Sequence, residues 1–365
     1  MVRGKHKGKS TARSSKGAVE FTPDQPDTYG DAHPKELLRM IPEDHDVLKS
    51  LANQHIVSAA QFDRATLLQL FRLAAKYEAN PDRFSTPLQG KILISAFYEP
   101  STRTRLSFES AWHRLGGDIM SITDRATTGI AKGESLRDIG EMFNNYGDCV
   151  VLRDSGERSV LEMMDGLRIP IINAGNGTDE HPTQALADVY TILKWAPGLL
   201  AGTIAPIRIG VIGVPARMRT VRSLLTLLGR FSDCIEEVVV IHDGSSETLF
   251  SEGQYEDLAH DGLNVRTTTE LVGELPNLDV TYINAIAWVK GGFEVMGSQF
   301  IISAESQLKK DSIILHPLAR GGELCTSLDN TPHNWYFAQA RGAVFVRMAL
   351  LTCMTQRTSR VMDVV

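Results

Sequence analysis

The sequence predicts an α/β fold with two doubly wound parallel sheets. Short apolar runs rich in β-branched residues alternate with segments of helical periodicity, which is typical of parallel sheets with helices on both faces. The chain has 365 residues, enough for two domains of ordinary size. We therefore expect one sheet before the break at Trp195-Ala196-Pro197-Gly198 and one after it.

The composition is that of a globular protein and argues against several classes of partner. Hydrophobic residues make up 42% of the chain and charged residues 22%, and the net charge of −6 argues against nucleic acid as a partner. No apolar run approaches the roughly 20 residues that span a bilayer, so no membrane partner is expected. The four cysteines lie far apart, which predicts neither a zinc site nor disulfides and fits a reducing, cytoplasmic location.

Residues 1–33 are predicted to form a mobile, basic tail. They are rich in Gly, Ser, Lys, Asp and Pro and poor in large apolar side chains, so they cannot drive burial. The first 16 residues hold six Lys and Arg, no acid and no apolar core, which excludes a secretory signal. An organelle transit peptide is an alternative to a cytoplasmic location, although an amphipathic apolar face is missing.

The first sheet is predicted from segments between residues 34 and 194. A helical pattern is possible at 34–51 and clear at 63–77, where a broad apolar stripe precedes the breaking pair Asn80-Pro81. The later elements expected here are strands at 91–97, 119–122, 148–153 and 169–173, a helix ending at Gly116, and helices at 136–146 and 185–194.

The second sheet is predicted from the segments that follow residue 195. The elements expected are strands at 207–212, 237–241, 279–284 and 312–315 and a helix at 220–228. Thr331-Pro332 is expected to start the last helix.

The strand at 91–97 leads into the most informative turn, Ser101-Thr102-Arg103-Thr104-Arg105. The first N–H groups of the following helix have no partner within the helix, and the helix dipole places partial positive charge there. Hydroxyls and guanidiniums add donors that suit phosphate oxygens. A capping Ser-Thr beside two surface arginines is the alternative, but the doubled Thr-Arg weakens it. We expect a phosphate here.

Other polar residues follow other strands of the predicted first sheet. Arg153 ends the strand at 148–153, and His181 and Gln184 lie in a glycine-rich loop after the strand at 169–173. Ligands of parallel sheets gather at the carboxyl ends of strands, which favours a site role over an incidental surface histidine. Lys132 lies in an exposed, glycine-containing loop.

No cofactor and no metal are expected. Gly210, Gly213 and Asp243 suggest a dinucleotide site, but the third glycine of that motif is absent and Pro215 lies in the turn. The histidines lie outside the spacings of zinc-binding helices.

With these residues in place, the chain from about Leu51 to Thr355 resembles the aspartate/ornithine carbamoyltransferase family, and within it the aspartate branch. The motifs that carry the resemblance are Ser101-Thr102-Arg103-Thr104-Arg105, His181-Pro182-Thr183-Gln184, Arg219-Thr220-Val221, His316-Pro317-Leu318 and Thr331-Pro332-His333-Asn334-Trp335-Tyr336-Phe337. The resemblance implies a carbamoyl phosphate domain at 34–194, an amino-acid domain at 195–335 and a C-terminal helix at 336–365 that packs on the first domain. It also implies a homotrimer with shared active sites and no cofactor.

The resemblance implies transfer of the carbamoyl group from carbamoyl phosphate to an amino-acid acceptor, which serves pyrimidine biosynthesis when the acceptor is aspartate. The phosphate would be held by Ser101, Thr102, Arg103 and Thr104. The carbamoyl group would be held by Arg153, His181 and Gln184, with Thr104 and the Leu318 carbonyl helping. The residues expected to act in catalysis are Arg103, Thr104, Arg153, His181 and, from a neighbouring subunit, Lys132.

The acceptor side departs from the family pattern. Arg219 matches the arginine that holds the α-carboxylate, but Ala285 and Ala287 replace the Arg-x-Gln pair that holds the side-chain carboxylate of aspartate. Either Lys290 or Arg222 supplies the missing cation and aspartate remains the leading acceptor, or the acceptor is a different amino compound. A non-catalytic protein that binds carbamoyl phosphate or a partner enzyme is a further hypothesis, against which the retained cationic residues argue.

Overall fold

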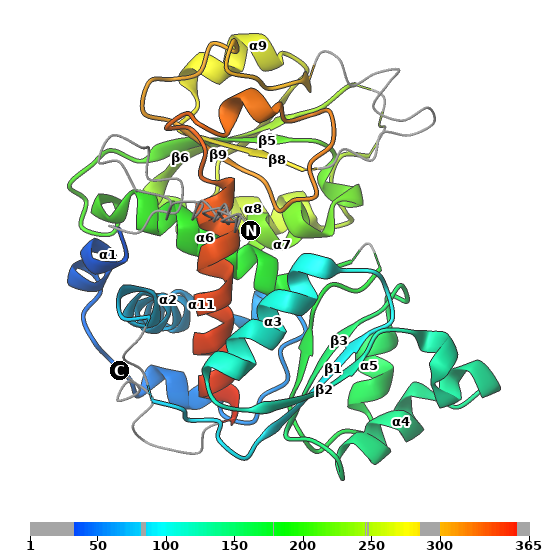
Figure 1. Cartoon of the computed structure of the whole chain (residues 1–365). Helices are drawn as coiled ribbons and strands as arrows, with labels where there is room; N and C mark the ends of the chain where they lie inside the picture. The colour runs from blue at the N-terminus through cyan, green and yellow to red at the C-terminus, as the bar shows by residue number, and fades with distance from the viewer. Residues whose placement is uncertain are drawn as a thin grey trace, which may run out of the picture.

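The computed structural model describes residues 33–81, 85–177, 179–244, 246, 248–284 and 300–355. The predicted tail at 1–33 therefore lies almost entirely outside the described residues. Figure 1 shows the two sheets one above the other, with the long helix α11 (Tyr336–Thr355) running from beneath the upper sheet down beside the lower one. In the described ranges, no helix is both long and apolar enough to cross a membrane.

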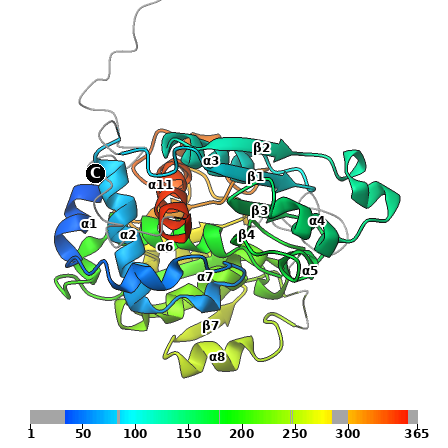
Figure 2. The ribbon, with the colours of Figure 1, turned by 90° about the horizontal axis from the view of Figure 1, so that it is seen from below.

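The first sheet has four parallel strands in the order β2-β1-β3-β4. Its elements are β1 (Ile92–Phe97), α3 (Thr102–Arg114), β2 (Asp118–Ile122), α4 (Leu136–Phe143), β3 (Cys149–Arg153), α5 (Ser159–Met164) and β4 (Ile171–Asn173). Side chains alternate between the two faces of a strand: Leu93 and Phe97 join one apolar cluster with α3, while Ile94 and Ala96 join another with α4 and α5. Both faces are therefore covered, as predicted (Figures 1 and 2).

The second sheet has five parallel strands in the order β7-β6-β5-β8-β9. Its elements are β5 (Ile207–Ile212), α7 (Arg219–Gly229), β6 (Ile235–Ile241), α8 (Gln254–His260), β7 (Val265–Thr268), α9 (Leu271–Glu274), β8 (Val280–Ile283) and β9 (Ile313–Leu315). Ile209 and Val211 pack toward α7, whereas Ile212 packs toward α9. The strand β7 was not predicted, because its Arg and Thr residues are typical of a sheet edge rather than of a buried strand.

Helix α11 packs on α2 (Arg64–Ala79) and on α6 (Pro182–Trp195), and α6 also packs on α7 of the second sheet. Helix α11 contacts α2, α3 and α6, which confirms that the C-terminal helix returns to the first part of the chain. It is apolar on nearly all sides and mostly buried, as expected of a helix without a solvent face. A fully buried ion pair joins α2 to α6, with 2.9 Å between Lys194 Nζ and Glu78 Oε1.

The helical pattern at 34–51 forms two shorter pieces. Helix α1 covers Pro34–Met40, and a 3₁₀ helix covers Val47–Leu51. Pro42 explains the interruption, because it lacks an N–H donor and disfavours helical geometry in the residue before it. The Ile41 backbone is accordingly extended, with φ −105° and ψ 109°.

The last helix starts later than predicted: α11 begins at Tyr336 and not at Thr331-Pro332. The Ile314 N–H donates to the His333 carbonyl at 2.8 Å, and the Trp335 N–H donates to the Ile314 carbonyl at 3.3 Å. The segment just before α11 therefore lies along β9, and these sheet-like bonds replace the helical bonds that Pro332 would otherwise begin.

Candidate active site

A cavity of about 510 Å³ opens where strands of both sheets end. Loops after β1, β3 and β4 line it from the first sheet, and loops after β5, β8 and β9 line it from the second, in agreement with the rule for parallel sheets. The predicted site residues that the structure brings together here are Ser101, Thr102, Arg103, Thr104, Arg153, His181, Gln184, Arg219 and Leu318.

The predicted phosphate turn leaves its donors available. Helix α3 begins at Thr102, and the side chain of its N-cap Ser101 makes no capping hydrogen bond, although a serine at this position usually does. The first N–H groups of α3 are thus directed to a ligand or to solvent. Burial lowers the pKa of Arg103, so a bound anion would favour its charged form.

Arg153 and Arg219 meet across the cavity at a single carboxylate. Arg153 Nε donates to Glu99 Oε2 at 3.0 Å, and an Arg219 guanidinium nitrogen lies 3.6 Å from the same oxygen. Burial, followed by the nearby Arg219, lowers the pKa of Arg153 to about 10. Arg153 therefore stays charged at neutral pH, and the two guanidiniums exceed the negative charge that Glu99 supplies.

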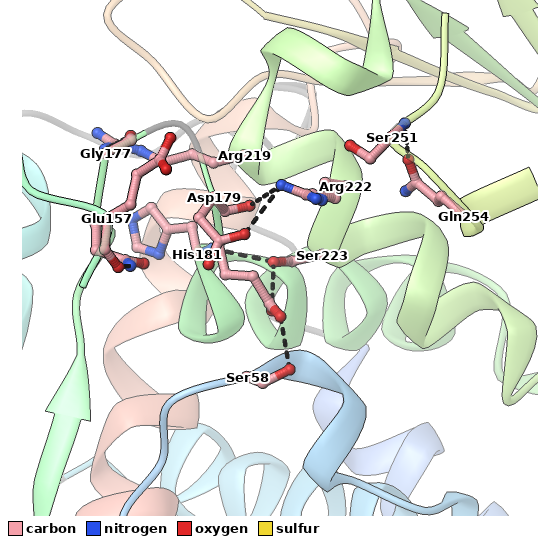
Figure 3. A network of polar contacts seen from close by, with 12 residues as sticks. Ser58, Glu157, Gly177, Asp179, His181, Arg219, Arg222, Ser223, Ser251 and Gln254 are labelled. Carbon is pink, nitrogen blue, oxygen red and sulfur yellow. Dashed lines mark hydrogen bonds and ion pairs between the residues drawn. The ribbon is translucent and has the colours of Figure 1, made fainter. Parts of the chain in front are cut away.

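His181 is a buried, neutral imidazole. Its backbone N–H donates to Ser223 Oγ at 3.0 Å (Figure 3), and Ser223 Oγ in turn donates to Glu180. Burial, Arg153 and Arg219 keep the pKa of His181 well below its usual value. Its buried Nδ1 has no hydrogen-bond partner in the described part of the chain. The ring is thus suited to hydrogen bonding with a ligand rather than to carrying charge.

The comparisons with known proteins agree with this geometry. The family model for the carbamoyl-P binding domain of aspartate/ornithine carbamoyltransferase matches residues 54–194. The aspartate carbamoyltransferase catalytic subunit of Sulfolobus acidocaldarius is 38% identical over 306 residues, which cover 82% of this chain and 98% of that protein. The chain belongs to the aspartate/ornithine carbamoyltransferase family.

Other members of the family are similar over most of the chain. The chloroplastic aspartate carbamoyltransferase of Arabidopsis thaliana is 35% identical over 315 residues, covering 83% of this chain and 78% of that protein. The Trypanosoma cruzi aspartate transcarbamoylase, solved in complex with carbamoyl phosphate and aspartate, is 33% identical, with a TM-score of 0.75 and coverage of 84% of this chain and 96% of that one. The carbamoyltransferase fold predicted from the sequence is confirmed.

Two of the predicted cations, Lys132 and Arg222, do not line the cavity. Lys132 is exposed on the 3₁₀ helix Gly129–Lys132. Arg222 lines a separate cavity of about 350 Å³ and donates to Asp179 Oδ1 at 2.9 Å (Figure 3). Arg222 is therefore not placed to replace the missing acceptor cation. Lys290, together with the replaced positions Ala285 and Ala287, lies outside the described residues.

Sequence reasoning missed two residues that shape the cavity. Gly175 has φ +105°, and a Cβ there would lie 3.1 Å from His181 Cδ2 and 3.4 Å from Arg153 Nη1, so glycine allows these groups to approach. Arg217 lines the cavity from the turn after β5 and is exposed. Its guanidinium has no ion-pair partner among the described residues. Only the glycine-rich composition of the loop around Gly175 gave a signal in advance.

Proposed function

We propose that this chain is an enzyme that transfers the carbamoyl group of carbamoyl phosphate to the amino group of aspartate. The observation that carries the proposal is the cavity itself. The anion-binding turn, Arg153 and His181 line it from the first sheet, while Arg219 lines it from the second. Membership of the carbamoyltransferase family supports the reaction, and the ligands of the Trypanosoma cruzi enzyme support the same pair of substrates.

The cavity supplies donors for the charge that develops during transfer. When the amine attacks the carbonyl carbon, negative charge grows on the carbonyl oxygen, and phosphate then leaves. Thr104, Arg153 and His181 are proposed to hydrogen-bond this oxygen, and one such donor typically contributes about 3 kcal/mol. Arg103 and the α3 N-terminus stabilise the departing phosphate. That phosphate is also a suitable acceptor for the amine proton.

The charge of the cavity favours an acceptor with two carboxylates. The guanidiniums that line it are those of Arg103, Arg153, Arg217, Arg219 and Arg347, and Glu99 is the one carboxylate among the described lining residues. Carbamoyl phosphate brings roughly two negative charges at neutral pH, by analogy with a phosphoryl group whose second pKa is about 6. Positive charge therefore remains for an anionic acceptor. Aspartate fits this requirement, because the form with a neutral amine, which can attack, carries two carboxylates.

We propose that Arg219 holds the α-carboxylate and that Arg217 holds the side-chain carboxylate. Arg217 and Arg219 lie two residues apart in the connection between β5 and α7. The forked guanidinium group of an arginine is suited to binding a carboxylate. Lys290 stays an alternative cation for the second carboxylate. Carbamoyl transfer to a different amino compound is the competing hypothesis, because of Ala285 and Ala287.

The proposal is tested by mixing the purified protein with carbamoyl phosphate and L-aspartate, L-asparagine, L-glutamate or L-ornithine, and following phosphate release and the carbamoylated product. We expect the highest kcat/KM with L-aspartate and a loss of about 10²–10³ in Arg103→Ala, as for removal of one transition-state donor. L-Asparagine is the matched control, since it lacks only the second charge. A higher value with another amine would establish the different acceptor, and phosphate release equal to that of Arg103→Ala would favour a non-catalytic binding protein.

We also propose that the enzyme is a homotrimer in which Lys132 reaches a neighbouring active site. The segment that carries Lys132 follows β2 and extends beyond the first sheet in Figure 2. Its base is tied down by Arg125, which donates to the buried Asp154 at 2.9 Å. The Lys132 side chain is thus solvent-exposed in one chain and is available to a second copy.

We propose a role in pyrimidine biosynthesis and a cytoplasmic location. The first follows from aspartate as acceptor, and the second from the composition and the unpaired cysteines. Organelle targeting by the basic residues 1–33 is the alternative, and the Arabidopsis thaliana relative carries the description chloroplastic. Fluorescence microscopy of the tagged full-length chain, with and without residues 1–33, distinguishes the two locations.

A further inference from the structure

We propose that Asp188 is a positioning residue that makes the active site select a carbamoyl group over groups of the same shape that lack its NH₂. This inference rests on the proposed function, because it concerns how the same cavity recognises its donor substrate. Asp188 lies on α6, is completely buried and does not line the cavity. It acts through two glutamines and a loop that do line it.

Asp188 determines which end of the Gln184 amide faces the ligand. Gln184 lies one helical turn earlier on α6, and its Nε2 donates to Asp188 Oδ1 at 2.7 Å. An ionised carboxylate can only accept hydrogen bonds. It therefore holds the NH₂ end of the amide toward itself, and the amide oxygen of Gln184 is left to accept a hydrogen bond from a ligand.

The same carboxylate oxygen orders the opposite wall of the cavity. Gln339 Nε2, on α11, donates to Asp188 Oδ1 at 2.6 Å, and Gln339 Oε1 accepts from the His316 N–H at 2.8 Å. The Leu318 N–H then donates to His316 Nδ1 at 2.7 Å. This series of bonds connects Asp188 to the loop after β9 that carries Leu318, whose carbonyl is the second predicted acceptor for the carbamoyl group.

The two acceptors match a chemical feature that is specific to the carbamoyl group. Its NH₂ offers two N–H donors, whereas the methyl group of an acetyl phosphate has a similar shape and offers none. If the Gln184 amide were reversed, its NH₂ would face the NH₂ of the ligand, and a donor would be left unsatisfied on each side. Asp188 therefore contributes to selection without touching the substrate.

Other charged and polar groups around Asp188 are consistent with an ionised carboxylate. The Arg347 guanidinium of α11 is buried nearby and attracts the negative charge, and the Tyr282 hydroxyl of β8 also interacts with Asp188. Burial nevertheless raises the pKa of Asp188 to about 7. Experiments on selection therefore belong at about pH 8, where the carboxylate is mostly ionised.

The test compares two stable ligands in calorimetric titrations of the full-length protein. Phosphonoacetamide keeps the carbamoyl NH₂, and acetonylphosphonate replaces it by a methyl group. We expect the wild-type protein to prefer phosphonoacetamide, and Asp188→Leu, which has no acceptor for the two glutamine NH₂ groups, to reduce that preference about tenfold, as expected when one to two hydrogen bonds are lost. Acetonylphosphonate should bind both proteins almost equally.

Two further variants make the test specific. Gln339→Leu, which breaks the connection to the loop after β9, should also reduce the preference, and it serves if Asp188→Leu does not fold. Thr191→Val is the matched control on α6, because its buried hydroxyl bonds, among the described residues, only to the helix carbonyl of Ala187, and it should keep the wild-type preference. Equal weakening of both ligands, or an unchanged preference, would overturn the inference. Failure of the wild-type protein to bind either ligand would instead contradict the proposed function.

Discussion

At the scale of single residues, Arg217 and Arg222 differ in where they lie and in whether they have a partner among the described residues. Arg222 donates to Asp179 at 2.9 Å, whereas Arg217 is exposed at the cavity. We expect Arg217→Met to raise the KM for L-aspartate about tenfold, since a hydrogen bond to a charged group contributes about 1.5 kcal/mol or more. The KM for carbamoyl phosphate should not change. Steady-state kinetics of Arg217→Met beside Arg222→Met check this, and equal effects of the two substitutions would contradict it.

His181 leads to a prediction about stability and pH. Burial and then Arg153 hold its pKa in the folded protein well below 6.5, whereas in the unfolded chain it titrates near 6.5. Below about pH 6.5 the unfolded state binds more protons than the folded state, so the free energy of unfolding falls by up to about 1.4 kcal/mol for each unit by which the pH is lowered. Above about pH 6.5, His181 adds no pH dependence. Urea unfolding in phosphate-free buffer between about pH 5 and pH 7.5 should show a shallower decline in His181→Asn. Parallel profiles for the two proteins would argue that the folded His181 is not held neutral.

The site residues that could be predicted are those that directly follow a strand. Arg153 ends β3, and Ser101 begins the turn into α3, so the rule for parallel sheets was enough to bring them together. Asp188 and Gly175 could not be found in this way. Asp188 on α6 accepts a hydrogen bond from Gln339 on α11, which lies 151 positions later in the sequence. The role of Gly175 depends on a backbone angle.

At the scale of the helices, the packing of α2 against α6 depends on a buried charge pair. Removing one partner of such a pair typically costs about 3 kcal/mol or more when the remaining charge is left uncompensated. Here Arg341 Nε also lies 3.5 Å from Glu78 Oε1. We expect Lys194→Met to lower the free energy of unfolding by up to about 3 kcal/mol, since Glu78 is completely buried and keeps only the longer ion pair with Arg341 among the described residues. Glu78→Gln combined with Lys194→Met should recover much of the loss, because the Tyr190 hydroxyl can still donate to the amide oxygen.

The measurement is the free energy of unfolding from urea titrations of the three proteins. Lys91→Met is the matched control, because Lys91 pairs with Asp148 at 3.3 Å in a partly exposed position, where such pairs contribute about 0–1 kcal/mol. A loss in Lys194→Met no larger than that of the control would mean that Arg341 alone compensates the charge of Glu78.

Strand prediction succeeded where burial alone decides the structure. The strand β5 was predicted at 207–212 and found at Ile207–Ile212, because a β-branched run buried on both faces has few alternatives. The strand β7 was missed because it is short, polar and at the edge. The start of α11 was misplaced because the backbone bonds of Ile314, distant in sequence, hold the preceding segment in an extended form.

At the scale of the whole molecule, the proposed trimer makes a prediction about mixed subunits. If each site takes Arg103 from one chain and Lys132 from a neighbour, Arg103→Ala and Lys132→Ala are each inactive as pure proteins. After joint refolding of equal amounts, about one quarter of the sites should contain both native residues, by random assembly of a symmetric oligomer. Carbamoylation rates and the mass measured by light scattering check this. Activity no higher than that of the separate variants would show that each chain uses its own Lys132.

The burial of α11 has a consequence for how the chain is made. This helix is translated after both sheets, yet its apolar surface completes the packing of α2, α3 and α6, which are translated much earlier. Until Tyr336–Thr355 has left the ribosome, those earlier helices keep apolar surface open to solvent, since domains generally fold as units during synthesis. Nascent chains stalled before Tyr336 should therefore bind a chaperone that recognises apolar segments, and full-length chains released from the ribosome should not.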